Sequence, residues 1–422
     1  MKFLRVGICA LVVFAVASHG AVEDWARAIL EIGAAFLFLV WAVRAYLKEE
    51  AGLVISPLLL PFVALSLVVL AQCVFHRTAS RYDTWQDLQL LLADVLLLFL
   101  AAQVFRTVED FRRFVWFTMA FGFLVALFGI LQHLTFNGKL YWFREMHFGG
   151  VPFGPYVNRN HFAGFAELVI PVSLVPLVLG KVRRERWFLV SLFAVVPIGA
   201  LFFSASRGGI VSFGVELGVL AIWFVLRRSA KRHLLSAAAV LVLTFLMVSW
   251  LGVRQSLERF SSMQSLEVTH GKRTSMAADT WHIFLDHPWL GTGLGTLQDV
   301  FPRYETLYDG KVVNHTHNDY LEALAETGIA GGLCCVWFLG TLLLESLRRL
   351  SRATGAFAST VQLSGLIACL GFLTHSLVDF NLHIPANALL FFLLANLATA
   401  DIRQLPTASP DPTRMRYQGR KQ

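Results

Sequence analysis

Charged side chains are scarce in this sequence. Asp, Glu, Lys and Arg together make up 15% of the 422 residues, whereas hydrophobic residues make up 56%, and the mean hydropathy is +0.61. Soluble globular proteins carry about 25% charged residues. The shortage argues against a soluble enzyme and indicates a membrane protein that crosses the bilayer many times.

Acidic residues are outnumbered by basic ones, 28 to 36, which leaves a net charge of +8. Such a balance can indicate a nucleic-acid partner. Here the basic residues form short clusters between apolar runs, a pattern that sets membrane topology. We therefore expect membrane lipids, and no nucleic acid, as partners.

Cysteine is also rare, and no long polar block is present. All five cysteines fall in apolar stretches, so we expect neither a disulfide framework nor a metal site from them. A nucleotide-sugar transferase would need a soluble domain with acidic metal ligands. The sequence predicts no such domain, no metal and no cofactor.

Apolar runs long enough to cross about 30 Å of hydrocarbon are abundant. Twelve transmembrane helices are predicted near 4–19, 25–43, 53–75, 86–105, 114–134, 161–180, 187–204, 208–226, 234–252, 321–345, 358–379 and 384–400. The first also resembles a signal peptide. We favour a helix, because a multi-pass protein needs no cleavage.

The basic clusters orient these spans. With the N-terminus in the cytoplasm, the predicted inside segments hold 23 of the 36 lysines and arginines, as the positive-inside rule requires. We expect three regions: N-terminal transmembrane helices over 1–150, a second transmembrane domain over 151–400 with a large outside loop at 253–320, and a disordered cytoplasmic tail at 401–422.

Two arginines outside the basic clusters are candidate anion ligands. Arg207 interrupts apolar sequence at a Ser/Gly-rich reversal, where a guanidinium and exposed amides suit an anion. Arg273 precedes an amphipathic pattern that predicts a helix from Thr274, so the helix dipole would add to its pull on phosphate. The alternatives are a snorkelling side chain for Arg207 and an ordinary loop charge for Arg273.

Histidine and asparagine gather before two of the predicted spans. Asp319 and Glu322 have capping-box spacing, which puts His317 and Asn318 just before a helix at the water boundary. His315 and His317 form an H-x-H pair, but no third metal ligand is evident, and we predict no metal there.

The second polar group is the run of residues 158–161 before the span at 161–180. Asn158 or Asn160 can cap that helix. Arg159 and His161 would then face the outer aqueous side. Acids within the spans indicate either an ion pathway or hydrogen bonds inside the bundle, and Asp379 with two nearby histidines reads as an outer turn.

Taken together, these residues resemble the O-antigen ligase and polymerase family of bacterial inner-membrane glycosyltransferases, most clearly over residues 150–385. The element N-x-N-x-F-A, the element S-R-G and the motif H-[NSQ]-x9-G-x-x-G-G occur in the family's order. Their matching positions are Asn158, Asn160, Phe162 and Ala163; Ser206, Arg207 and Gly208; and His317, Asn318, Gly328, Gly331 and Gly332. The element H-P-x-L-G-x-G after Arg273 matches at His287, Pro288, Leu290, Gly291 and Gly293.

The resemblance implies an all-α, GT-C-like membrane enzyme that transfers a glycan from undecaprenyl diphosphate at the periplasmic face, without nucleotide or metal. Arg207 and Arg273 match arginines that bind the diphosphate, and His317 matches the base for the acceptor hydroxyl. Supporting roles fall to Asn158, Arg159, Asn160, His161, His315 and Asn318. The multi-pass chain would lie in the bacterial inner membrane with both termini cytoplasmic.

Three acceptors stay open: lipid A–core, another lipid-linked glycan, and a protein. A ligase transfers to lipid A–core, and the complete histidine–glycine motif favours it. A polymerase joins lipid-linked repeats of an O-antigen or exopolysaccharide. A transporter or flippase is a more distant alternative, since its polar groups would thread through the middle of the spans, in two matching halves.

Overall fold

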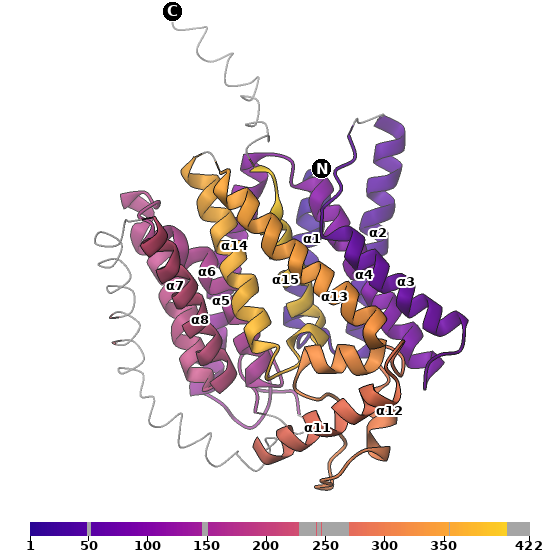
Figure 1. Ribbon diagram of the computed structural model, residues 1–422. Helices are drawn as coiled ribbons and strands as arrows, with labels where there is room; N and C mark the ends of the chain where they lie inside the picture. Colours follow the sequence, from indigo (N-terminus) through magenta and orange to yellow (C-terminus); the bar gives the residue numbers. More distant parts are fainter. Residues whose placement is uncertain are drawn as a thin grey trace, which may run out of the picture.

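The computed structural model describes residues 1–48, 52–145, 151–227, 270–353 and 355–402, with single residues 242 and 246. This described part is helical and contains isolated β-bridges but no β-sheet. Figure 1 shows long helices running side by side in a bundle. They are α1 (Lys2–Ala17), α2 (Asp24–Lys48), α3 (Leu59–Val74), α4 (Arg81–Val104), α5 (Val108–Leu134), α6 (Arg159–Val178), α7 (Arg184–Ser204), α8 (Arg207–Leu226), α13 (Asp319–Ser351), α14 (Ala356–His375) and α15 (Pro385–Thr399).

Eleven of the predicted spans coincide with helices of the described residues. Eight of these helices are long and apolar enough to cross a membrane, and α3 and α15 are shorter apolar helices. The ninth predicted span, 234–252, and the tail from residue 403 lie outside the described residues. An all-α polytopic membrane protein is therefore confirmed, while the count of twelve, the division at residue 150 and the sidedness stay predictions.

Helix α6 is the central helix of the bundle. It packs against α5, α7 and α14, and its side chains are buried over nearly its whole length. Lipid is as apolar as leucine, so helices in a membrane associate through close packing and polar contacts rather than by leaving water. A Cβ atom on Gly122 of α5 would lie 2.7 Å from Val169 Cβ of α6, which shows how closely these two helices approach.

A small module covers one end of the bundle. It comprises residues 270–317 and contains α11 (His270–Asp286), α12 (Leu297–Val300) and the 3-10 helix η2 (Phe301–Arg303). Its own apolar core is separate from the core of the bundle and includes Met276, Ile283 and Phe301. We call residues 270–317 the external module. The N-terminus of α1 lies at the opposite end of the bundle (Figure 1).

Helix α13 is broken at Gly328, which corrects the prediction of one straight span over 321–345. Gly328 has φ 62° and ψ −163°, a conformation essentially reserved for glycine. A Cβ there would collide with the backbone of Trp289. Ile329 N and Ala330 N instead donate to the carbonyls of Pro288 and Trp289. The three glycines of the motif therefore do not lie on one uninterrupted helix face.

The break binds the external module to the bundle. Thr292 N and Gly293 N donate to the carbonyls of Ala325 and Glu326, and the Glu326 carboxylate accepts from Gly295 N and Leu297 N. Backbone and carboxylate groups around residues 325–330 thus replace the helical hydrogen bonds that the break removes. The short segment 319–327 is thereby held at the end of the bundle, where the polar candidates gather.

Candidate functional site

The polar residues predicted from the sequence meet around one turn, residues 376–380, between α14 and the 3-10 helix η3 (Asn381–His383). The first residues of α6, α8 and α13, together with α11, lie around it. We call residues 376–380 the site turn.

His317 is held against the site turn. Its backbone has φ 54°, in the left-handed region that non-glycine residues seldom adopt. Its Nδ1 lies 3.1 Å from Asp379 Oδ1. The next two residues hold this arrangement, because Asn318 Nδ2 donates to Leu377 O and Asp319 N donates to Ser376 O, both at 3.0 Å. Three consecutive residues are thus tied to one turn.

Asp379 is a buried carboxylate surrounded by histidines. Besides His317, His161 Nε2 lies 4.0 Å from its Oδ1. Burial alone would raise the pKa of Asp379, but the neighbouring His317, His161 and His375 lower it well below the usual range. Asp379 therefore stays ionised and can fix the orientation of the His317 ring.

The N-terminus of α6 supplies the predicted supporting residues. Asn158 is the N-cap and accepts from Asn160 N at 2.9 Å, one of the two caps that the sequence allowed. Arg159, Asn160 and His161 are buried, so the prediction that Arg159 and His161 face the outer water is wrong. His161 instead packs edge-on against Phe380, with ring centroids 4.7 Å apart.

Arg207 begins α8, directly after a tight reversal. Ala205 has φ 50°, and Ser206 caps α8 by accepting from Gly209 N. The side chain of Arg207 is exposed. Beside it, a Cβ on Gly208 would lie 2.5 Å from His375 Nε2. The other nitrogen of that ring, Nδ1, lies 2.9 Å from the buried carboxylate of Glu167. The backbone beside Arg207 therefore touches the last residue of α14.

Arg273 approaches the site turn from the external module. It lies in the first turn of the described part of α11, three residues after His270. Its guanidinium is 3.5 Å from Val378 O. Its buried Nε has no hydrogen-bond partner among the described residues. A buried guanidinium nitrogen without a partner is costly, and an anion would satisfy it.

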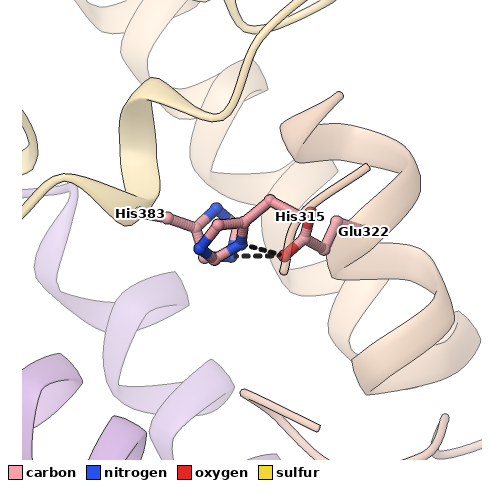
Figure 2. A group of neighbouring side chains, drawn as sticks. All are labelled: His315, Glu322 and His383. Carbon is pink, nitrogen blue, oxygen red and sulfur yellow. Dashed lines mark hydrogen bonds and ion pairs between the residues drawn. The ribbon is translucent and has the colours of Figure 1, made fainter. Parts of the chain in front are cut away.

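A second polar cluster lies on the other side of Phe380. His315 stacks on Phe380 with ring centroids 4.3 Å apart, and its Nδ1 lies 2.7 Å from Glu322 Oε1. His383 places Nδ1 2.8 Å from Asp319 Oδ1 and Nε2 3.4 Å from Glu322 Oε1. Figure 2 shows the rings of His315 and His383 next to each other, facing Glu322. We call His315, Asp319, Glu322 and His383 the His–Glu cluster.

The His–Glu cluster corrects the predicted capping box. The helix does begin at Asp319, but its N-cap is Asn318, which accepts from Leu321 N at 3.0 Å. Glu322 accepts from Thr316 N at 2.9 Å rather than reaching back to cap. Burial alone would lower the pKa of His383. The carboxylates of Glu322 and Asp319 outweigh this effect and raise the pKa of His383 to about 10.

Sequence reasoning missed four of the central residues. From the sequence, we interpreted the stretch that holds His375, Asp379 and His383 as an outer turn. We interpreted Glu167 as one of several acids within the spans. Their partners lie far away in the chain: Asp379 meets His317 across 62 positions. The available signal was the density of histidine and carboxylate in one short turn.

A cavity of about 830 Å³ lies at the opposite end of the bundle. Apolar residues, Gln103, Arg106 and Arg349 line it, and none of its described lining residues is a histidine. It is therefore separate from the chemistry described above.

Comparison with known families gives one match. The O-antigen ligase family model matches residues 192–336. This stretch includes Arg207, Arg273, His317 and the three motif glycines, and it confirms the resemblance to the O-antigen ligase and polymerase family. Asp379, His383 and all of α6 lie outside it. No curated protein matches the chain.

Proposed function

We propose that this chain transfers a glycan from undecaprenyl diphosphate to an acceptor hydroxyl, with lipid A–core as the acceptor. The family match supports transfer between lipid-linked glycans in general. The observation that carries the finer proposal is the site turn, where a histidine–carboxylate pair lies near Arg273 and near the start of α8, which bears Arg207.

The His317–Asp379 pair suits a general base. When Nδ1–H donates to the ionised Asp379 carboxylate, the lone pair on Nε2 is left for the acceptor hydroxyl. The hydroxyl oxygen then forms a bond to the anomeric carbon as the bond from that carbon to the diphosphate oxygen breaks. The hydroxyl proton moves to His317 Nε2, and the diphosphate leaves with the electron pair. Direct displacement of this kind inverts the anomeric carbon.

The arginines suit the leaving group. A diphosphate is already a good leaving group, so the paired carboxylic acids of a glycosidase are not needed. What is needed is fixed positive charge where negative charge develops. Guanidinium groups stay protonated and bind phosphate oxygens in pairs. Arg207 and Arg273 would supply this charge from two directions, and neither nucleotide nor a metal at the diphosphate is required.

The proposed sidedness follows from the basic clusters. The clusters near the start of α1 and α7 lie at the end of the bundle away from the site turn. If that end is cytoplasmic, the site turn faces the periplasm. Carrier-linked glycans would meet the site there without entering the cytoplasm.

Glycan analysis of a strain lacking the gene tests the proposal. Long chains stranded on the carrier indicate a ligase, and single repeats indicate a polymerase. Complementation with His317→Ala should leave transfer about 10²–10⁴-fold slower, because the base is lost. His282→Ala removes an exposed histidine of α11 and should restore the wild-type profile. An unchanged profile in the deletion strain, or full activity of His317→Ala, would overturn the proposal.

A further inference from the structure

We propose that the His–Glu cluster is a binding site for one divalent transition-metal ion, Zn²⁺ by its ligand chemistry. The ligands would be His315 Nδ1, His383 Nε2 and Glu322 Oε1. This inference goes beyond the proposed function and does not depend on it.

The donor atoms are already gathered. The three ligand atoms lie within 4.8 Å of one another, and Figure 2 shows the three side chains close together. A tetrahedral zinc ion with bonds of about 2.0–2.1 Å separates neighbouring ligands by about 3.3–3.5 Å. His383 Nε2 and Glu322 Oε1 are 3.4 Å apart. His315 Nδ1 is 2.7 Å from the same oxygen, so this pair would open by about 0.6 Å as its hydrogen bond is replaced.

The residues behind the ligands are also in position. His383 Nδ1 is 2.8 Å from Asp319 Oδ1, so its Nδ1–H donates outward, and the ion would displace the proton from Nε2, which faces the cluster. A carboxylate behind a metal-bound histidine is a recurring arrangement that fixes the ring and raises its basicity. The other oxygen of Glu322 accepts from Thr316 N and Thr316 Oγ1, which leaves Oε1 for the ion.

Charge favours a cation here. Asp319 and Glu322 are buried, at 3% and 1% exposure. Two histidines face these carboxylates. A divalent ion would neutralise the excess negative charge in a place where water cannot. Imidazole and carboxylate together suit zinc better than magnesium or calcium, which prefer oxygen alone.

The site would also have an entry path. The His315 side chain is 30% exposed, whereas Glu322 is 1% exposed. An ion could therefore enter past His315, and a water molecule could complete its coordination. Once bound, it would join the segment before α13 to η3. His317 and Asp379 lie on these same two segments, so the ion would fix their relative position without contacting a substrate.

Metal content of the purified full-length protein tests the inference. A tag without histidine should be used, and the protein should be stripped with chelator, equilibrated with Zn²⁺ and desalted. Wild type should retain about one Zn²⁺ per chain. Glu322→Gln and His383→Gln should retain at least about tenfold less. His317→Ala and His282→Ala should retain as much as wild type, because neither residue is a ligand.

A measurement on the wild type alone tests the inference even if the variants fail to fold. Zn²⁺ should raise the midpoint of thermal unfolding by about 2–5 °C, because it binds only the folded chain. The same concentration of Mg²⁺ should leave the midpoint unchanged. The inference is overturned if wild type retains less than about 0.2 Zn²⁺ per chain, or if folded Glu322→Gln binds as much as wild type.

Discussion

His315 and His317 are two residues apart and contact the same phenyl ring, yet their surroundings differ in charge. The ring of His315 stacks on Phe380, while that of His317 meets it edge-on at 4.9 Å. Around His317 the carboxylate Asp379 has three histidines near it, one of which, His375, also pairs with Glu167, and Arg273 reaches the neighbouring carbonyl. The arrangement has more groups able to carry positive charge than negative charge.

Around His315, which stacks on Phe380, the balance is reversed. There His315 and His383 face two buried carboxylates, Asp319 and Glu322. The same residue types therefore make an environment suited to an anion on one side and to a cation on the other. The difference teaches that the ratio of carboxylates to cations, rather than the presence of histidine, decides what such a cluster binds.

Both clusters depend on the break in α13, so Gly328→Ala should have the largest effect. The positive φ disfavours any L side chain, and the added Cβ meets the Trp289 backbone. We expect a loss of more than about 3 kcal/mol in stability, measured as loss of folded protein and a lower unfolding midpoint. Gly340→Ala, in the same helix with nothing within 4 Å, is the control. Equal behaviour of the two variants would contradict the structural role of the break.

Asp379→Asn should separate the two clusters by activity. The amide can no longer anchor Nδ1–H with a charge, so we expect kcat to fall about 10²–10⁴-fold with little change in KM for the donor. Glu322→Gln, on the other side of Phe380, should cost less than about tenfold in kcat. Steady-state transfer to a defined acceptor measures both. Similar losses in kcat would show that the two clusters act as one.

Arg273→Lys should have a smaller effect than Gly328→Ala or Asp379→Asn. Lysine keeps the charge but loses the planar pair of donors, so we expect KM for the donor to rise about tenfold. Arg303→Lys, at an exposed arginine of η2, should leave KM unchanged. Transfer rates measured at varied donor concentrations give kcat and KM for both variants and test this prediction. A fall in kcat without a change in KM would move Arg273 away from donor binding.

Local signals predicted most of the fold. Apolar runs gave the helices, and the polar residues before them gave the starts of α6 and α13, because capping depends on a few adjacent residues. The break at Gly328 was missed, since one positive φ inside an apolar run leaves no mark in composition. Its cause lies in the backbone of residues 288–294.

The site was predicted less completely than the fold. Arg207, Arg273 and His317 were proposed from the sequence because each interrupts its surroundings. Asp379 and His383 could not be assigned, because their partners lie 60 or more positions away and come close only through packing of α13 against α14 and η3. The role of Asp379 depends on this distant partner, which sequence spacing alone does not give.

The separate core of the external module has a consequence for how the two proposed substrate-binding arginines are positioned. Arg207 stands on the bundle and Arg273 on the module, so the spacing between the two guanidinium groups is set where the two bodies are joined, at residues 288–297 and 325–330. These joining residues fix the position of the external module relative to the bundle. If Arg207 and Arg273 hold a pyrophosphate as proposed, changes in these joining residues would alter how tightly it is bound.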